Sequence, residues 1–389
     1  MSARRQGGNG RQGSEPMSVD PRAELSPDDA MGMLDAQRSA VAAFLERERP
    51  PANLVGFGVG VRWTDGQPTG ERAVIAFVQH KVPEEALAEA DRLPRTHEGV
   101  AVDVMAVGQL YAGVDVAPAA PVTAPTPVPD GSMVSTAPTP MGGSTLAHAL
   151  NARMRPVPGG FSVGHFAITA GTIGVAAYDI LPGGSVNPPR PGVGQPTDHY
   201  ILSNNHVLAN SNAGSPGDAV LQPGVADGGQ FPGDEIAILA RFVPIQFFPP
   251  VPPFLHHNLV ACAVARGNPK DLDRRIWWEG QVRGWRRRTN VRVGNLVQKT
   301  GRTTAWNTGR IIAVLATVDV NYGGGRVARF RDQILTTPIA MPGDSGSLVL
   351  TWDNVAVGLL FAGSPLVTVC NQIENVRSLL RVEVAQLIL

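Results

Sequence analysis

The sequence predicts a mainly β protein, in which short antiparallel strands form two packed barrels behind a small α/β unit. Two observations carry this prediction. Glycine (44 residues) and proline (34) are both frequent, while aromatic residues make up only 6%. In addition, the C-terminal two thirds of the chain breaks into short apolar runs separated by turn residues. Many short strands joined by turns use such a composition, and a helical bundle does not.

Length and charge set the broad limits. The 389 residues are enough for two or three domains and a sizeable core. The 33 basic and 33 acidic residues give a formal net charge of zero, so bulk charge points to neither nucleic acid nor a membrane surface. One basic cluster, Arg283 and 286–288 around Trp285, is interpreted as a solvated loop or an oligomer contact rather than a nucleic-acid site. No apolar run reaches the roughly 18 residues of a transmembrane helix.

The cysteines and the N-terminus indicate a cytoplasmic protein. Cys262 and Cys370 both lie in apolar surroundings and are expected to be reduced, buried thiols, since a secreted protein would more often carry disulfides. Residues 1–24 are rich in Arg, Gly and Ser and have no apolar core of a signal peptide. We therefore expect a cytoplasmic location.

Composition divides the chain into four parts. Residues 1–24 have little to bury and predict a disordered tail. Residues 25–113 predict a helix followed by a small α/β domain. Residues 114–146 are rich in Pro, Ala and Thr and predict an extended linker. Residues 147–389 then form the main β domain.

We expect one helix near the N-terminus, after the predicted tail, and another at the C-terminal end of the β domain. Ser26 as N-cap and Pro27 in the first turn predict a helix that runs to Arg49, where two prolines stop it. Apolar residues at helical spacing predict a second helix over 373–389.

The expected strands of the N-terminal part are 54–63, 72–82 and 99–107, with a short helix over 83–90 between the last two. Those of the β domain are 162–168, 171–178, 200–207, 236–243, 259–264, 282–285, 296–299, 309–314, 332–336, 347–350 and 356–361.

The most informative stretch is Gly343-Asp344-Ser345-Gly346, which runs directly into an apolar strand. Glycines allow a sharp turn that presents a serine hydroxyl and points the N–H groups of Gly343 and Ser345 at one spot. Such an arrangement would stabilise a tetrahedral oxyanion. The stretch therefore predicts Ser345 as a nucleophile and these two amides as its oxyanion hole. A plain tight turn before a strand is the alternative.

A second stretch supplies the base that a serine nucleophile requires. The run Tyr200-Ile-Leu-Ser-Asn-Asn-His206-Val-Leu is an apolar strand that ends in a histidine. His206 precedes Ser345, an order found in chymotrypsin-like proteases and subtilisins but reversed in α/β-hydrolases. We expect the two side chains to face each other in the cleft between the barrels.

The acid of a Ser-His-Asp triad is missing from its expected position. The stretch Asn258 to Ala265 has the pattern of the strand that carries this Asp in intracellular trypsin-like proteins, but the acid position holds Ala261. Other carboxylates between His206 and Ser345 remain open as replacements. They are Asp218, Asp227, Asp234, Glu235, Asp271, Asp273, Glu279, Asp319 and Asp332.

Together these motifs resemble the narrow-leaf trypsin-like serine proteases of plants and their bacterial relatives. Besides the His206 and Ser345 stretches, the resemblance rests on Asp218 to Gly229 and on Lys299-Thr-Gly-Arg-Thr-Thr304, and it covers most of 147–389. It implies a chymotrypsin/trypsin-like double β-barrel, intracellular serine endopeptidase activity on protein or peptide substrates, and assembly into homo-oligomers. We expect no cofactor and no metal, and neither nucleic acid nor a membrane as a partner.

Two functions remain open at this point. The first is an endopeptidase with impaired turnover, favoured by the presence of His206, Gly343 and Ser345. The second is a pseudoprotease that binds protein segments as a regulatory scaffold, favoured by Ala261. Because the N-terminus offers no zymogen-type partner, we expect Asp344 to find a cation or N–H donor inside the second barrel. The stretches expected to line the specificity pocket, 337–341 and 358–363, contain no acid and are either an apolar pocket or core.

Overall fold

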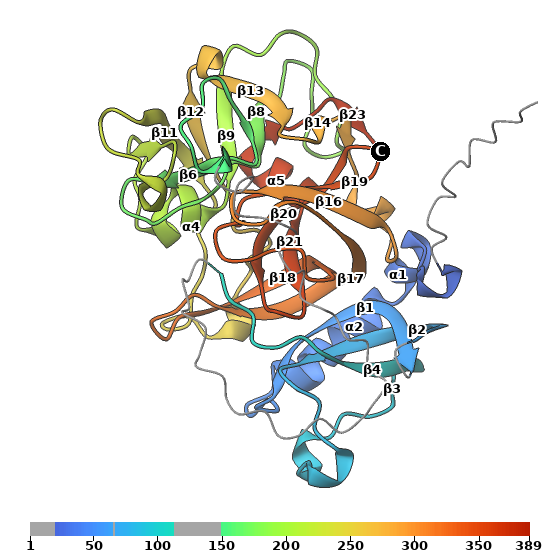
Figure 1. Cartoon of the computed structure of the whole chain (residues 1–389). Coiled ribbons are helices and arrows are strands. Elements are labelled where there is room, and N and C mark those ends of the chain that lie inside the picture. The colour runs from blue at the N-terminus through green and yellow to red at the C-terminus, as the bar shows by residue number, and fades with distance from the viewer. Residues whose placement is uncertain (1–19, 65–66, 113–148) are drawn as a thin grey trace, which may run out of the picture.

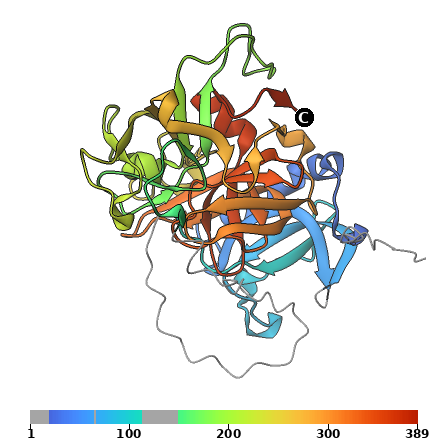
Figure 2. The ribbon, with the colours of Figure 1, turned by 45° about the horizontal axis from the view of Figure 1, so that its top comes forward.

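A mainly antiparallel sheet, an antiparallel sheet and a small third one make up the described part of the protein. The computed structural model describes residues 20–64, 67–112 and 149–389. The predicted linker and most of the predicted N-terminal tail lie outside these ranges. The mainly β prediction is confirmed, because the described elements include sheets of 12 and 8 strands and only short helices. In Figures 1 and 2 the eight-stranded sheet, green to yellow, lies on one side of the orange and red strands. The blue N-terminal strands lie on the other side.

Six strands of the larger sheet close on themselves. They follow the order β16 (Leu296–Gly301), β19 (Leu348–Thr351), β20 (Val355–Gly363), β21 (Thr368–Gln372), β18 (Val327–Thr336) and β17 (Ala305–Asn321). The long strand β17 also pairs with β16, from Leu296 opposite Arg310 to Gly301 opposite Ala305, and this pairing completes the ring. Two short strands, β15 (Gly284–Trp285) and β23 (Leu387–Ile388), pair parallel at its side. This ring is one barrel.

The eight-stranded sheet is curved but remains open among the described residues. Its order is β22 (Val382–Glu383), β8 (Val175–Asp179), β9 (His199–Ser203), β12 (Ala263–Gly267), β11 (Glu235–Phe242), β10 (Ala219–Leu221), β6 (Ser162–His165) and β7 (Gly171–Thr172). The third sheet contains β14 (Gly280–Gln281), β13 (Leu272–Ile276) and β5 (Val157–Gly159). The double-barrel expectation is thus met in part.

The N-terminal strands continue the barrel sheet and do not form a separate one. β1 (Leu54–Thr64) pairs with β17, and β2 (Gln67–Val78), β4 (Val100–Ala106) and β3 (Thr96–His97) follow in order. The sequence of β1 explains this contact, because its glycines leave room for the neighbouring backbone. A Cβ on Gly56 would lie 2.0 Å from the Thr317 carbonyl oxygen. Ile75 and Phe77 of β2 share a hydrophobic cluster with Phe330 and Phe361 of the barrel.

The predicted N-terminal helix is divided into shorter pieces. Ser26 caps it as expected, and its hydroxyl accepts a hydrogen bond from the Asp29 N–H at 3.1 Å. α1 (Pro27–Gly32) and α2 (Leu34–Ala40) meet at Met33, whose ψ of 2° breaks the helix, and a π-turn (Val41–Leu45) follows. The expected helix over 83–90 is instead a pair of 3₁₀ turns, Glu84–Ala86 and Glu89–Asp91.

The predicted C-terminal helix over 373–389 is wrong beyond its first half. α5 (Ile373–Leu380) ends where Arg381 adopts the left-handed conformation, with φ of 56°. The chain then forms β22, in which Glu383 accepts a hydrogen bond at 2.9 Å from Nε of the buried Arg377. Pairing of β22 with β8 and this buried ion pair outweigh the helical apolar pattern.

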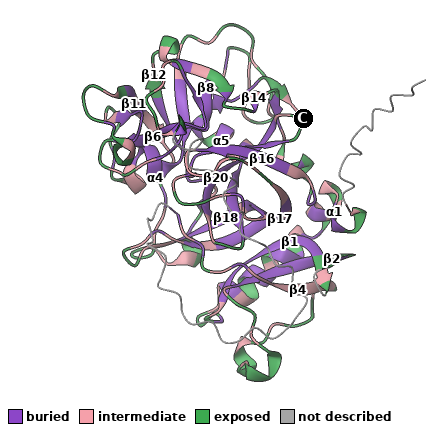
Figure 3. Cartoon of the chain, viewed as in Figure 1, coloured by how far each residue is buried: buried purple, intermediate pink, exposed green. Residues whose placement is uncertain are grey.

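Burial follows the sheets (Figure 3), with strands mainly buried and connecting turns exposed. Cys262 and Cys370 are buried and unbridged, as expected. None of the helices in the described ranges is long and apolar enough to cross a membrane. The remaining helical elements are α4 (Asn205–Leu208) and 3₁₀ turns at Pro21–Ala23, Asn210–Asn212, Val225–Asp227, Pro253–Leu255, Pro269–Asp271 and Arg288–Asn290.

Candidate active site

His206 stands on a single helical turn, α4, that follows strand β9 directly. The two asparagines before it hold this turn in place. Asn204 donates through its side chain to the Ala261 carbonyl at 3.0 Å, and Asn205 donates to the Val243 carbonyl at 2.8 Å. The His206 ring is 7% exposed, and neither ring nitrogen has a hydrogen-bond partner among the described residues. Burial without a partner lowers its pKa to about 4. The imidazole is therefore neutral at pH 7.

Ala261 lies beside this turn and is fully buried. Its carbonyl oxygen also accepts from the Asn205 N–H at 3.2 Å, and its own N–H donates to the Asn371 side-chain oxygen at 2.9 Å. A methyl group at this position gives His206 no acceptor. The structure thus places the position of the expected acid next to the residues that carry His206, with no carboxylate bonded to the ring in the described part of the chain.

The other carboxylates between His206 and Ser345 mostly bind other residues. The partners within bonding distance are His165 for Asp218, Arg302 for Asp227, Arg153 for Asp234, Arg275 for Asp273, Thr300 for Glu279, Arg329 for Asp319 and Asn375 for Asp332. None of these contacts involves the His206 ring, whose nitrogens have no partner among the described residues. Burial raises the pKa of the Glu279 carboxyl to about 7.

Tyr322 packs against the His206 ring, a contact that no sequence motif predicts. The two ring centroids are 6.1 Å apart in an edge-to-face arrangement. Tyr322 begins the turn between β17 and β18, and its ring also packs against Phe247 and Phe330, with centroids 5.0 and 6.3 Å away. No motif marks this tyrosine, because the contact depends on how far the long β17 hairpin reaches over the other sheet.

The loop around Ser345 turns at two glycines with positive φ, 96° at Gly343 and 99° at Gly346. Both positions exclude a side chain for steric reasons as well. A Cβ on Gly343 would lie 2.4 Å from an Arg302 guanidinium nitrogen, and one on Gly346 would lie 2.0 Å from the Ser203 hydroxyl. Ser345 itself is partly exposed. These constraints explain why the predicted turn needs glycine on both sides of the serine.

The amides of the expected oxyanion hole are uncommitted. Within the described residues, the N–H groups of Gly343 and Ser345 donate to no protein acceptor, whereas those of Asp344 and Gly346 bond to Met341 and Leu360 carbonyls at 3.0 and 2.8 Å. Gly343 and Ser345 are both partly exposed, so these amides are open to a ligand. Two free donors beside a serine hydroxyl are the arrangement that an anionic intermediate requires.

Asp344 anchors the loop inside the barrel, and Lys299 is its internal cation. The Lys299 ammonium lies 3.1 Å from the Asp344 carboxylate, and both side chains are fully buried. The carboxylate also accepts from the N–H groups of Thr303 and Thr304 at 2.9 and 3.1 Å, and from the Met341 N–H at 3.0 Å. The expectation of an internal partner is confirmed. Desolvation lowers the pKa of Lys299, and Asp344 opposes that shift.

A second set of contacts ties the loop to the other sheet. Thr172 of β7 donates its N–H to the Ser345 carbonyl at 2.8 Å and its hydroxyl to the Gly343 carbonyl at 2.9 Å. Arg302 donates its own N–H to that same hydroxyl at 3.1 Å and pairs through Nε with Asp227 at 2.8 Å. Both faces of the loop are therefore fixed by charged or hydrogen-bonded partners.

Contacts through β7 bring the two candidate catalytic residues to one place. A Cβ on Gly171 would lie 2.4 Å from the Val207 side chain, which follows His206, and 3.0 Å from the Ser345 carbonyl oxygen. Val207 and the Ser345 loop therefore meet at the same point of β7, and neither ring nitrogen of His206 hydrogen-bonds to the Ser345 hydroxyl in this structure. Catalytic hydrogen bonds are often long or poorly aligned in a site without substrate.

The expected specificity stretches serve partly as core. Ile339 and Leu360 lie in the same hydrophobic cluster as Val297 and are fully or almost fully buried. Met341, in contrast, is 52% exposed next to the Ser345 loop. The apolar character of these stretches therefore reflects barrel packing at least at two positions.

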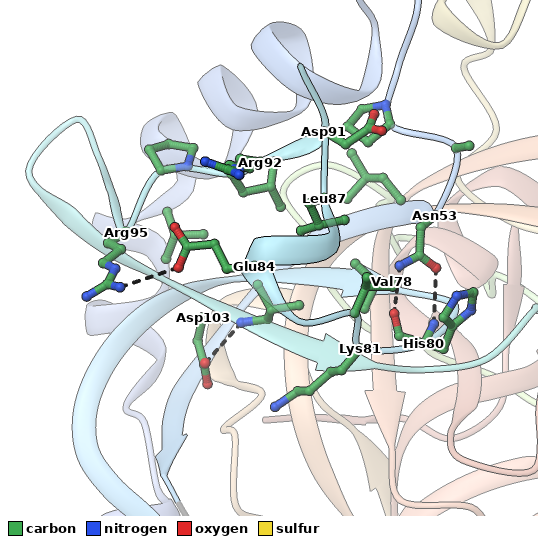
Figure 4. Close-up of a pocket in the computed structure, with 18 residues that line it drawn as sticks. Asn53, Val78, His80, Lys81, Glu84, Leu87, Asp91, Arg92, Arg95 and Asp103 are labelled. Carbon is green, nitrogen blue, oxygen red and sulfur yellow. Dashed lines mark hydrogen bonds and ion pairs between the residues drawn. The ribbon is translucent and has the colours of Figure 1, made fainter. Parts of the chain in front are cut away.

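A hollow of about 360 Å³ lies elsewhere, in the N-terminal part beneath the segment that carries the 3₁₀ turns (Figure 4). Some of its polar groups pair with each other. Asn53 exchanges two hydrogen bonds with the His80 backbone, at 2.6 and 3.1 Å, and Arg95 lies 3.4 Å from Glu84. This hollow is separate from His206 and Ser345, and its geometry indicates no catalytic role.

Comparison with known proteins gives limited likenesses. No protein-family model matches the chain. Over 102 residues, 26% of this chain, the sequence is 35% identical to Serine protease 2 of Streptomyces fradiae, and the match spans 56% of that relative. Among crystal structures, Cellulomonas bogoriensis chymotrypsin is similar over 59% of this chain and 99% of its own, with 20% identity and a TM-score of 0.37. Thermobifida fusca protease A is similar over 59% and 98%, with 17% identity and a TM-score of 0.40.

Proposed function

We propose that the chain is a serine endopeptidase homologue whose site keeps its nucleophile, base and oxyanion hole but lacks the acid. The observation that carries this proposal is the Gly343–Gly346 loop, in which two uncommitted amides flank Ser345 and a histidine lies across β7. The likeness to Serine protease 2 over 102 residues supports it. Protein or peptide segments are the proposed substrates.

Each residue has a distinct role in the proposed reaction. The Ser345 hydroxyl attacks the carbonyl carbon of a peptide bond while neutral His206 accepts its proton, and the resulting oxyanion accepts hydrogen bonds from the Gly343 and Ser345 amides. The imidazolium then gives its proton to the leaving amine, and water releases the acyl group by the reverse steps. Without a carboxylate, the buried imidazolium is poorly stabilised, so we propose slow turnover.

The finer assignments are also proposals. Membership of the narrow-leaf type, a cytoplasmic location and assembly into homo-oligomers follow only from the sequence resemblance and the composition. The cysteines, which are buried and unbridged, are compatible with a reducing compartment.

A fluorophosphonate probe tests whether Ser345 is a competent nucleophile. The probe carries its own leaving group and needs less help from the base than an amide does, so it should label Ser345 slowly and selectively. Mass spectrometry locates the adduct. Ser345→Ala should abolish labelling, and Ser215→Ala, which changes an exposed serine, should leave it intact.

The second candidate function, a binding scaffold without peptidase activity, is favoured by Ala261 and by the unpartnered His206 ring. It predicts no labelling of the parent protein even after long exposure at raised pH. That result would show that the loop does not present Ser345 and its amides as a working site.

A further inference from the structure

The edge of strand β20 next to the Ser345 loop is where an extended peptide would be able to pair. β19 covers this edge only as far as Leu359, which lies opposite Leu348. The loop itself takes the next position, where Gly346 donates its N–H to the Leu360 carbonyl at 2.8 Å and Ser347 accepts from the Leu360 N–H at 3.0 Å. Beyond Leu360, neither β19 nor the loop pairs with the edge.

This remaining edge is occupied by residues from the N-terminal part, which we call the bridging segment (Val107–Ala112). Tyr111 donates its N–H to the Gly363 carbonyl at 3.0 Å and accepts the Gly363 N–H at 3.0 Å, which is an antiparallel pair. The opposite edge of the segment bonds to Asn321 at the end of β17. There Ala112 donates to the Asn321 carbonyl at 3.0 Å, and Leu110 accepts the Asn321 N–H at 2.9 Å.

The bridging segment lies between two parts of the candidate active site, the strand next to the Ser345 loop and the turn that carries Tyr322. Gly363 lies on the strand that holds the Ser345 loop, whereas Asn321 immediately precedes Tyr322, which covers His206. Leu110 and Ala112 are 1% and 2% exposed. The bridging segment of the N-terminal part thus lies between the strand that carries the Ser345 loop and the turn that carries Tyr322.

The direction of the segment matters as much as its position. Because the pairing is antiparallel, residue numbers rise along the segment as they fall along β20, so its C-terminal direction leads from Gly363 towards Leu360. Three residues of β-strand span roughly 10 Å at about 3.3 Å per residue. The segment therefore approaches the Ser345 loop as the acyl side of an extended substrate would.

The contact is made by backbone groups. The Tyr111 hydroxyl bonds at 2.7 Å to Gln109 within the same segment, and its pairing with Gly363 uses only N–H and C=O. Addition of a strand to an open sheet edge is a common way to bind peptides of varied sequence. A tethered strand has an effective concentration in the millimolar range, enough to compete with free peptides.

We propose that the bridging segment is an intramolecular inhibitor that occupies the peptide-binding edge of β20. The inhibitory role rests on the proposed peptidase function. Whether the bridging segment blocks peptide binding at β20 can be tested without any catalytic activity. A substrate would bind only when the segment leaves Gly363, so the N-terminal part would control access to Ser345.

Full-length Tyr111→Pro tests the proposal, because proline removes the N–H that Gly363 accepts. Tyr111→Phe is the matched control, which loses only the hydroxyl bond to Gln109. The probe is a fluorescein-labelled synthetic peptide with the sequence of residues 107–112, and its binding is measured by fluorescence anisotropy. We expect at least tenfold tighter binding to Tyr111→Pro than to the parent or to Tyr111→Phe. Equal affinity for all three folded proteins would overturn the proposal.

A second pair of measurements separates this inference from the proposed function. Hydrolysis of a long peptide substrate should be at least tenfold faster in Tyr111→Pro, while labelling by a small fluorophosphonate, which needs no strand edge, should be similar in all three proteins. If no protein is labelled, the proposed function fails and the anisotropy result still decides the occupancy. If Tyr111→Pro does not fold, Ala112→Pro, which removes the bond to Asn321, takes its place. Unfolding of both variants would identify the segment as a structural element and overturn the proposal.

Discussion

At position 261 a single methyl group determines how His206 can work. The side chain is fully buried beside α4, and the imidazole next to it has no hydrogen-bond partner among the described residues. Burial therefore lowers the pKa of His206 to about 4 with nothing to oppose it. A neutral ring is able to accept a proton, but the charged ring that results is costly in this environment.

Ala261→Asp is expected to raise both the pKa of His206 and the peptidase rate. A carboxylate that accepts the imidazole N–H favours the charged ring, so the pKa should move from about 4 towards the ordinary value of 6.5 or above it. In chymotrypsin-type triads, replacing the acid lowers turnover by about 10⁴, so restoration should raise kcat by roughly 10³ to 10⁴. NMR titration of the ring and steady-state kinetics measure the two effects.

Ala261→Asn is the control, since it has a similar shape but no charge and should leave the pKa depressed. If Ala261→Asp leaves turnover unchanged while replacement of a distant aspartate abolishes it, another acid has the triad role.

At the scale of the element, the Ser345 loop depends on partners that come from other strands. Lys299 of β16 lies inside the barrel against Asp344, and the N–H groups of Thr303 and Thr304 bond to the same carboxylate. Removing one member of a buried ion pair leaves an uncompensated charge, which is far more costly than losing a surface pair.

Lys299→Met is therefore expected to lower the free energy of unfolding by about 3–5 kcal/mol and to slow the labelling of Ser345. Urea denaturation measures the first effect, and fluorophosphonate labelling under native conditions measures the second. Lys270→Met, which changes an exposed lysine, should alter neither. Normal labelling in a stable Lys299→Met protein would show that the amides of the loop hold their geometry without the pair.

The sequence predicted the elements of the site better than their partners. Small residues around Ser345 and the apolar strand before His206 are local patterns, so the turn and the strand were predictable. The Lys299–Asp344 pair joins residues 45 positions apart in the sequence. The motif that contains Lys299 does not by itself indicate which carboxylate the ammonium contacts. Tyr322 and the bridging segment lie in no motif at all, because their roles arise from long-range strand pairing.

The same distinction applies to the helices. Ser26 and its following residues predicted a helix start correctly, because an N-cap hydrogen bond is local. The apolar pattern after Ile373 predicted a helix up to Leu389, but Arg377 pairs with Glu383, and β22 joins β8 instead. Tertiary pairing overrode local periodicity there.

At the scale of the whole molecule, the N-terminal part and the barrel share a sheet and a core. β1 pairs with β17 over several residues, and Arg329 of β18 lies 3.6 Å from Glu46, which follows the N-terminal helices. The Gln37 side chain donates to the Phe57 carbonyl at 3.2 Å and to the Thr317 hydroxyl at 3.3 Å, which links helix, β1 and β17. We therefore expect one cooperative unit.

Gly56→Ala tests this cooperativity. Its Cβ would lie 2.0 Å from the Thr317 carbonyl oxygen, so β1 and β17 must separate, at a cost of about 1–3 kcal/mol. Amide hydrogen exchange should show reduced protection in β18 as well as in β1 and β2. Gly32→Ala, with nothing within 4 Å of the added atom, is the control and should be neutral or slightly stabilising. Loss of protection confined to β1–β4 would instead indicate an independent N-terminal unit.

The pairing of β1 with β17 also bears on how the protein behaves when cut. A fragment of residues 149–389 would keep His206 and Ser345, yet it would expose a strand edge beside the apolar side chains of Phe330 and Phe361. Open hydrophobic edges are templates for intermolecular pairing. We expect such a fragment to self-associate and to be poorly soluble. An activity assay on it would then measure aggregated rather than monomeric protein. We therefore expect the N-terminal strands, supplied on the same chain or as a separate partner, to keep the β domain soluble.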